Sequence, residues 1–197
     1  MGYSMDTITA DCYEGTTCLI NKFGITDEQQ LASVEGQITF AKGSELERQP
    51  IQGKFDFAHY KAIHRYLFED LYEWAGEIRL VDISKKGTRF AKANEIEQLA
   101  TACFARLKSE NFFKGQPFDK FVENIVDFYC VTNILHPFRE GNGRTQRIFL
   151  AQLIRFAGYD IHFSAIDTDE LMTATVHAAN GVDTYLKQLF KEAIISV

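Results

Sequence analysis

The residues best suited to chemistry lie in one uninterrupted segment of the chain. Its candidates are a histidine, a glutamate, a Gly-Asn-Gly turn and two of its three arginines, which are His136, Glu140, Gly141, Asn142, Gly143, Arg144 and Arg147. Histidine can accept a proton near neutral pH, whereas glycine amides and arginine side chains commonly bind phosphate. Together these residue types predict the transfer of a phosphoryl or nucleotidyl group to a hydroxyl.

Two expected helices hold this segment from either side. Residues 119–135 are apolar around most of the helix, which is typical of a helix in the centre of a domain. Pro137 should end that helix, because proline disfavours helical geometry in the residue before it. Residues 144–157 have a helical pattern of apolar side chains. Residues 138–143 are then a short loop that leads into a helix N-terminus.

The N-terminus of this second helix predicts an anion site. The first amides of a helix have no internal partners, and the helix dipole adds positive charge there. Gly141 and Gly143 are expected to adopt positive φ and to let the backbone approach a phosphate. Arg144 and Arg147 are three residues apart, so both guanidinium groups should leave the same face of the helix and bind phosphate oxygens.

Glu140 is the carboxylate within this cationic segment, and it predicts a metal ion. A carboxylate next to a phosphate is repulsive unless a cation lies between them. Magnesium commonly uses one or two protein carboxylates together with phosphate oxygens, so Glu140 is the expected Mg²⁺ ligand. His136, at the end of the buried helix, is expected to take a proton from the incoming nucleophile.

Each of these features also has an ordinary structural explanation. A histidine before a proline usually only ends a helix, and a Gly-Asn-Gly sequence is usually only a turn. Two arginines are usually solvated or paired with carboxylates. A structural explanation must account for every feature separately, so their occurrence together favours the functional interpretation.

The segment resembles the signature motif of the Fic family, His-Pro-Phe-x-(Asp/Glu)-Gly-Asn-Gly-Arg-x-x-Arg, and matches every fixed position. The resemblance extends to residues 64–79, which look like the family's helix leading into its flap. It covers the chain from about residue 55 to about residue 190.

Helical patterns dominate the chain, and the expected fold is all-α, a Fic-type helical bundle with a small β-hairpin flap over the active site. Residues 1–54 are expected to form an N-terminal extension, and residues 55–197 the Fic core, within one globular unit.

Most Fic proteins are protein adenylyltransferases, which move AMP from ATP to a Ser, Thr or Tyr hydroxyl of a target protein and release pyrophosphate. The resemblance implies that His136 is the general base and that Glu140 binds Mg²⁺. It assigns the Gly-Asn-Gly turn to the α- and β-phosphates and the two arginines to the β- and γ-phosphates. The implied nucleotide-binding residues are Gly141, Asn142, Gly143, Arg144 and Arg147. Phe138 would anchor the loop on the core.

The donor is a point on which the family divides. Members that act as kinases carry lysine where this chain has Gly143, so Gly143 favours AMP transfer. Other members transfer UMP or phosphocholine with a similar motif, and these donors remain alternatives. A nucleotide-binding module without turnover is a further alternative.

Residues 81–91 fit the hairpin flap of the family. Short apolar runs bracket the polar turn Lys85-Lys86-Gly87, which is typical of a hairpin. An extended segment of a target could add backbone hydrogen bonds to such an edge. Lys85 and Lys86 are expected to be solvated charges.

Regulation by a partner protein is also implied. Many Fic proteins are inhibited by a helix with the pattern (Ser/Thr)-x-x-x-Glu-(Gly/Asn), whose glutamate pairs with the second arginine of the motif. Glu35-Gly36 has the right ending, but Leu31 replaces the hydroxyl residue. Residues 13–25 resemble the opening of members that a separate antitoxin controls. We therefore expect inhibition in trans near Arg147, with Glu35 as the alternative in cis.

Composition and expected helices limit the remaining possibilities. A length of 197 residues suits one domain, and a net charge of −6 argues against general nucleic-acid binding. The chain has neither an apolar run of membrane-spanning length nor an opening signal peptide. Its four cysteines lack metal spacing and fit a reducing compartment. We therefore expect a cytoplasmic protein without membrane or nucleic-acid partners. Asn180 is a candidate for the border of an adenine pocket. The expected helices are 26–36, 57–74, 94–109, 119–135, 144–157, 167–180 and 182–194.

Overall fold

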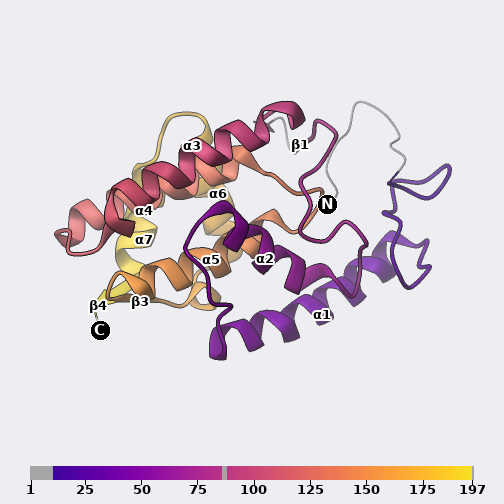
Figure 1. Cartoon of the computed structure of the whole chain (residues 1–197), viewed down its shortest axis with the longest axis horizontal. Coiled ribbons are helices and arrows are strands. Elements are labelled where there is room, and N and C mark those ends of the chain that lie inside the picture. Colours follow the sequence, from indigo (N-terminus) through magenta and orange to yellow (C-terminus); the bar gives the residue numbers. More distant parts are fainter. Residues whose placement is uncertain (1–10, 86–87, 197) are drawn as a thin grey trace.

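The computed structural model describes residues 11–85 and 88–196 and is dominated by helices (Figure 1). The α-helices are α1 (Glu28–Arg48), α2 (Phe57–Phe68), α3 (Ile96–Ser109), α4 (Phe118–Leu135), α5 (Asn142–Phe156), α6 (Thr168–Ala179) and α7 (Thr184–Ala193). The 3-10 helices are η1 (Ala93–Glu95), η2 (Asn111–Phe113) and η3 (Phe163–Ala165). The strands are β1 (Ser84–Lys85), β2 (Thr88–Arg89), β3 (Tyr159–Ile161) and β4 (Ile194–Ser196).

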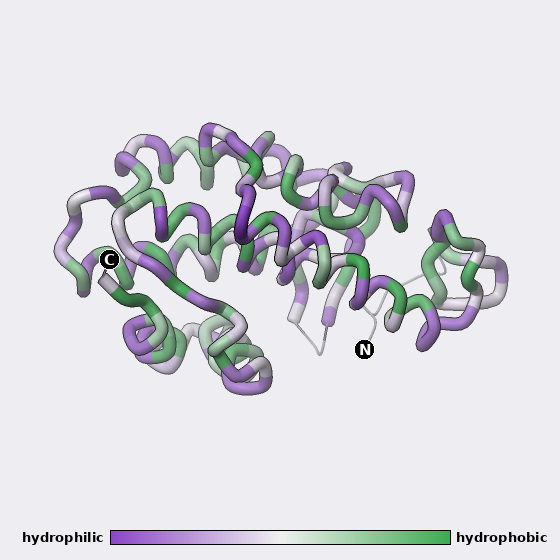
Figure 2. The backbone as a smooth tube through the Cα atoms, turned by 90° about the horizontal axis from the view of Figure 1, so that it is seen from below, coloured by the Kyte–Doolittle hydropathy of each residue, from purple (hydrophilic) through white to green (hydrophobic). Residues whose placement is uncertain are grey.

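Helices α4 and α5 form the centre of the bundle. Helix α5 packs against α2 and α4, while α3 and α7 pack on α4, and α1 lies along α2. Apolar and polar stretches alternate along the helices (Figure 2), as expected for helices that bury one face. Phenylalanine and tyrosine rings fill the centre, and Tyr60, Phe121, Phe138 and Phe149 are almost completely buried.

The predicted all-α fold with a small hairpin is confirmed. Strands β1 and β2 pair antiparallel, with Ser84 opposite Arg89 and Lys85 opposite Thr88. The expected turn residues Lys86 and Gly87 lie outside the described residues. A second antiparallel pair was not predicted from the sequence, and it joins β3 to β4. The division of the chain at residue 54 stays a prediction.

Helix α1 is longer than predicted, because it continues past Gly36 to Arg48. Glycine weakens a helix interior by roughly 1 kcal/mol, so sequence reasoning favoured an end there. Burial reverses that preference, since Leu31, Glu35 and Leu46 all lie on the buried face of the helix. Tertiary packing along the whole face therefore stabilises a helix that local propensity would end early.

Helix α2 is shorter than predicted and ends at Phe68 instead of residue 74. The segment after it forms turns and then reverses at Gly76, which has a φ of +84°. The amide of Gly76 donates to Nδ1 of His64 over 2.8 Å, which ties this turn back to the helix. The rings of Tyr72 and Trp74 stack with a centroid separation of 4.3 Å. Among the described helices, none is both long and apolar enough to cross a membrane.

Replacing Gly36 with alanine tests the continuation of α1. A Cβ at Gly36 has no heavy atom within 4 Å, and the position lies inside a helix. Gly36→Ala should therefore raise the free energy of unfolding, measured by urea denaturation, by about 0.5–1 kcal/mol.

Gly24 is the matched control, because it also has open space around a Cβ but has a φ of +67°. Gly24→Ala should destabilise the protein, since alanine disfavours that backbone conformation. Destabilisation by Gly36→Ala as well would contradict a continuous α1.

Candidate active site

The predicted site residues come together where α4 ends and α5 begins. His136, Gly143 and Arg147 line a cleft of about 130 Å³, whereas the lining does not include Glu140, Gly141, Asn142 or Arg144. The cleft is lined by the hairpin, the last turn of α4, the first turns of α5 and one face of α6. Its lining includes Lys85, Phe90, His136, Gly143 and Arg147.

His136 ends α4 in a left-handed conformation, with a φ of +41°. Its backbone amide donates to the carbonyl of Thr132, and its Nδ1 lies 3.0 Å from the carbonyl of Asn133. A carbonyl oxygen only accepts hydrogen bonds, so Nδ1 carries the hydrogen and the lone pair of the neutral ring is at Nε2. The ring of Phe90, from the end of the hairpin, stacks on the imidazole at 3.7 Å between centroids.

The surroundings of His136 keep its imidazole neutral. Burial lowers the pKa of His136 to about 3, and the positive charges of Arg79 and Lys85 add to this effect. A neutral imidazole is the form that accepts a proton. The site therefore holds His136 in its basic form at physiological pH.

Arg79 joins the end of α4 to the hairpin, and sequence analysis gave it no role. Its side chain is buried, and its Nε donates to the carbonyl of His136 over 2.9 Å. Its two terminal nitrogens donate to the carbonyls of Val81 and Ala91, which flank the hairpin. The backbone amide of Arg79 also donates to the carbonyl of Pro137.

The side chain of Asn142 closes the loop between the two helices. Its Oδ1 accepts from the amide of Phe138 over 2.8 Å, and its Nδ2 donates to the carbonyl of the same residue over 2.7 Å. Asn142 is buried, and Phe138 is completely buried against the ring of Tyr60. Because both polar ends of the Asn142 side chain bind the loop, its backbone amide is the group best placed to face a ligand.

His64 of α2 contacts the loop between α4 and α5. Its Nε2 lies 3.0 Å from the carbonyl of Glu140, and its ring stacks on Phe138 at 3.8 Å between centroids. Since Nδ1 accepts from the amide of Gly76, the hydrogen of the neutral ring is on Nε2. Burial lowers the pKa of His64 to about 3. Sequence analysis offered no signal for this contact, because the partners lie far apart in the chain.

The two glycines of the turn have different roles. Gly141 has a φ of +78°, and a Cβ there would collide with the ring of Phe68, so glycine is required twice over. Gly143 lies inside α5, so the expectation of a positive φ at Gly143 was wrong. Helix α5 begins at Asn142, two residues earlier than predicted, which leaves the first amides of the helix at the cleft.

Glu140 is the carboxylate of the loop that could hold a divalent cation. Its Oε1 accepts from the amide of Gly141 over 2.8 Å and lies 3.6 Å from Arg144. Its Oε2 has no hydrogen-bond partner within the residues that the structure describes. Burial raises the pKa of Glu140, and the nearby carboxylate of Glu35 raises it further. A divalent cation would offset both effects, and a hard carboxylate oxygen suits Mg²⁺.

Arg144 points toward α1, where it meets Glu35. The Glu35 carboxylate forms an ion pair with Arg144, and its second oxygen accepts from the hydroxyl of Tyr72 over 2.5 Å. Arg144 also donates to the hydroxyl of Thr39 over 2.9 Å. Burial and the negative charge of Glu35 raise the pKa of Tyr72, so Tyr72 remains a hydrogen-bond donor. The sequence indicates Glu35 only as a possible inhibitor and gives no sign of the contacts of Tyr72 and Thr39.

Arg147 lines the cleft beside Gly143 and the hairpin residue Lys85, whereas Arg144 does not line it. The two guanidinium groups therefore face different surroundings, although their spacing predicted a shared face. Across the described part of the chain, no carboxylate lies within ion-pair distance of Arg147. Burial lowers the pKa of Arg147, and an anionic ligand would relieve that cost.

Helix α6 supplies an apolar wall that sequence analysis missed. Leu171, Met172 and Val176 line the cleft opposite the start of α5. Asn180, the expected border of an adenine pocket, is the C-cap of α6 and does not belong to this lining. A flat apolar base could pack on the wall formed by these side chains.

The profile of the Fic/DOC family matches residues 54–154. This chain belongs to the Fic/DOC family. It is 36% identical over 183 residues to the probable protein adenylyltransferase Fic of Salmonella typhimurium, covering 92% of this chain and 90% of that protein. It is also 39% identical over 176 residues to the protein adenylyltransferase VbhT of Bartonella schoenbuchensis, covering 89% of this chain but only 37% of VbhT.

Solved structures of Fic proteins share the fold. The BepC protein of Bartonella tribocorum, solved with bound AMPPNP, has a TM-score of 0.89 and 30% identity, covering 95% of this chain and 97% of that one. A Fic domain of Bartonella quintana with bound ADP has a TM-score of 0.88 and 29% identity, covering 94% of each chain. These relatives confirm the predicted family and an enzyme of the nucleotidyltransferase class.

Replacing His64 with phenylalanine tests its support of the loop. His64→Phe keeps an aromatic ring next to Phe138 but leaves the Gly76 amide and the Glu140 carbonyl without their partner. The free energy of unfolding, measured by urea denaturation, should fall by about 1–3 kcal/mol.

The same variant should change the dependence of stability on pH. The pKa of His64 is about 3 in the folded protein, whereas an unperturbed histidine has a pKa of about 6.5. Between about pH 6.5 and pH 3 the unfolded chain therefore binds a proton that the folded protein does not, and stability falls as the pH is lowered through this range. His64→Phe should reduce this fall, and an equal fall in both proteins would contradict the assignment.

Proposed function

We propose that this protein is a protein adenylyltransferase, which transfers AMP from ATP to a hydroxyl side chain of a target protein. The observation that carries the proposal is the fixed tautomer of His136. The Asn133 carbonyl holds Nδ1–H, so Nε2 is the basic atom of the ring, and Gly143 and Arg147 of α5 line the same cleft. This arrangement supports a base placed next to a phosphate site.

The proposed step is an in-line substitution at the α-phosphorus of ATP. The target hydroxyl oxygen forms a bond to the α-phosphorus, and its proton passes to Nε2 of His136. The bond between the α-phosphorus and the oxygen that bridges to the β-phosphate breaks, and pyrophosphate leaves. His136 is neutral at physiological pH, a state that permits Nε2 to accept this proton.

The phosphates would be held by the start of α5 and by arginine. The amides of Asn142 and Gly143 open the helix and have no internal helical partner. Arg147 would bind the terminal phosphates from the floor of the cleft, and Arg144 from the side of α1. Gly143 keeps the approach open, because a Cβ there would lie 3.3 Å from the Arg147 guanidinium.

Glu140 would hold Mg²⁺ together with phosphate oxygens of the nucleotide. The bound ion would neutralise negative charge on the phosphates. Glu140 itself also shapes the turn, because its carboxylate accepts from the amide of Gly141.

We propose that Glu35 positions Arg144 and that inhibition comes from a separate partner near Arg147. The Glu35 carboxylate is held between Arg144 and Tyr72, and Arg147 has no carboxylate partner among the described residues. A glutamate from a partner helix could pair with Arg147 and exclude the γ-phosphate. Glu35 pairs with Arg144, the first arginine of the motif, so the partner's glutamate would pair with Arg147, the second one.

Transfer of label from ATP tests the proposed reaction. ATP labelled at the α-phosphate or at the γ-phosphate would be incubated with Mg²⁺, cell lysate and either the wild type or His136→Ala. Protein should gain label from the α-phosphate only. His136→Ala should lower the rate by at least about 10²-fold, since general-base assistance is worth roughly 10²–10⁴-fold.

Other results would assign the scaffold differently. Label from the γ-phosphate would indicate a kinase. The absence of label from either position, with nucleotide binding retained, would favour a UMP or phosphocholine donor or a binding module without turnover. Undiminished transfer by His136→Ala would show that another group accepts the proton.

Replacing Glu35 with glutamine separates positioning from inhibition in cis. Glu35→Gln keeps the size of the side chain but removes the charge that holds Arg144. If Glu35 positions Arg144, kcat/KM for AMP transfer should fall by about tenfold. The control is Glu28→Gln, at the exposed start of the same helix, which should leave kcat/KM unchanged. Faster transfer by Glu35→Gln would instead identify Glu35 as an inhibitor in cis.

A further inference from the structure

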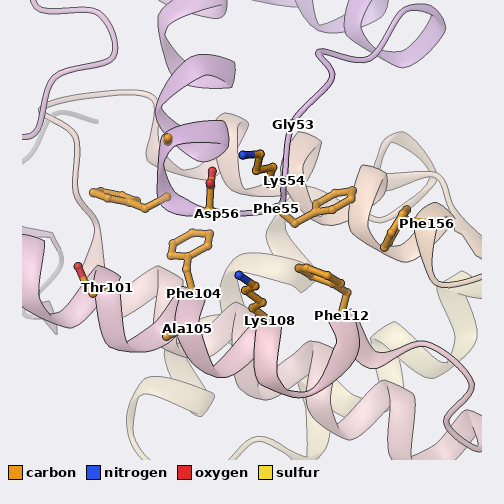
Figure 3. A pocket seen from close by; sticks show the side chains of 12 residues that line it. Gly53, Lys54, Phe55, Asp56, Thr101, Phe104, Ala105, Lys108, Phe112 and Phe156 are labelled. Carbon is orange, nitrogen blue, oxygen red and sulfur yellow. The ribbon is translucent and has the colours of Figure 1, made fainter.

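A second cavity of the described structure lies away from the catalytic cleft. It has a volume of about 630 Å³ and lies between the start of α2, the middle of α3, η2 and the end of α5 (Figure 3). Helix α5 begins at the active site and ends here at Phe156, and its length separates the two places by about 20 Å. We call this cavity the aromatic pocket, because five phenylalanines line it, which are Phe55, Phe57, Phe104, Phe112 and Phe156.

The rings come from segments that are distant in the chain and meet around the aromatic pocket. Phe55 and Phe156 pack with ring centroids 4.8 Å apart, and Phe55 lies 5.9 Å from Phe112. Phe156 is 42% exposed, although a large apolar side chain at a helix end is more stable when covered. Figure 3 shows Phe55, Phe112 and Phe156 grouped on one side of the pocket and Phe104 on the other.

Backbone strain is concentrated at the same place. Among the described residues, five residues other than glycine have a φ above +40°. One is the catalytic candidate His136, and the others are Phe55, Asn111, Phe112 and Phe113. Phe55 and Phe112 line the aromatic pocket, and the other two flank Phe112. Such conformations cost about 1–3 kcal/mol each and are typical of catalytic and ligand-binding sites.

The polar part of the aromatic pocket is cationic. Lys54 and Lys108 line it from two different segments, and neither forms an ion pair with any described residue. Lys114 lies over the Phe156 ring, 3.4 Å from its centroid. The carboxylate in the lining, Asp56, accepts a hydrogen bond from the amide of His59 and caps α2. Carboxylates outnumber cationic side chains in this chain, which has a net charge of −6, yet none pairs with these two lysines among the described residues.

We propose that the aromatic pocket binds a small organic anion, which has a flat, apolar aromatic body and one carboxylate or sulfonate group. The rings would enclose the body, and Lys54 and Lys108 would hold the anionic group. The volume lies within the range of roughly 300–1,000 Å³ that is usual for small-molecule sites, and such sites combine apolar walls with few polar groups. This site is separate from the nucleotide cleft and does not depend on the proposed transfer reaction.

Binding of a fluorescent aromatic sulfonate tests the proposal. The probe is 1-anilinonaphthalene-8-sulfonate, and its uncharged counterpart is N-phenyl-1-naphthylamine. The wild type should bind the sulfonate more tightly than the uncharged probe. The double variant Lys54→Glu/Lys108→Glu should lower the affinity for the sulfonate by about tenfold or more, because two attractive charges become repulsive. The affinity of this double variant for the uncharged probe should differ from that of the wild type by less than twofold, because the phenylalanine rings remain.

Two controls locate the binding site. Lys92→Glu reverses an exposed lysine that does not line the aromatic pocket, and it should leave the affinity unchanged. Ala105→Trp places a large ring into the aromatic pocket from an exposed position on α3, and it should abolish binding of both probes. An unfolding curve for each variant shows whether the fold is retained.

Three results would overturn the proposal. Equal affinity of the wild type and the double lysine variant for the sulfonate would exclude the anion preference. Normal binding by a folded Ala105→Trp protein would place the probe elsewhere. Displacement of the sulfonate by excess ATP with Mg²⁺ would place it in the nucleotide cleft.

Discussion

The buried guanidinium of Arg79 holds the parts of the catalytic site in fixed relation to one another. Its hydrogen bonds reach the carbonyls of His136, Val81 and Ala91, so one side chain joins the end of α4 to both ends of the hairpin segment. The nearest described carboxylate, that of Asp82, is 4.0 Å away, and carbonyl dipoles provide most of the compensation for burying the charge. The same positive charge adds to the effect of burial on the pKa of His136.

The contiguous part of the site could be predicted from the sequence, because a single loop and two helix ends contain it. A proline, a glycine-rich turn and two apolar helices were enough to place His136 and Glu140 beside a helix N-terminus. The supporting contacts could not be predicted in this way. Glu35, His64 and Arg79 each reach the loop across a large sequence separation, and their own neighbours in the chain give no sign of it.

The errors in the prediction arose where burial overrides local preference. Gly36 signals a helix end, yet the buried face of α1, which includes Glu35, continues the helix to Arg48. Gly143 signals a positive φ, yet it lies inside α5. There the absence of a Cβ avoids a close contact with the Arg147 guanidinium. The spacing of Arg144 and Arg147 predicted a common direction, but α1 attracts the first guanidinium through an ion pair.

The pairing of β3 with β4 has a consequence for how the chain folds. The two strands enclose α6 and α7 in sequence, so their hydrogen bonds close a long loop at its base. Closing such a loop costs conformational entropy before its contacts form, and this cost grows only slowly with its length. The apolar wall of the cleft therefore lies on a helix within a loop whose two ends β3 and β4 join, and β3 follows the end of α5 that is distant from His136.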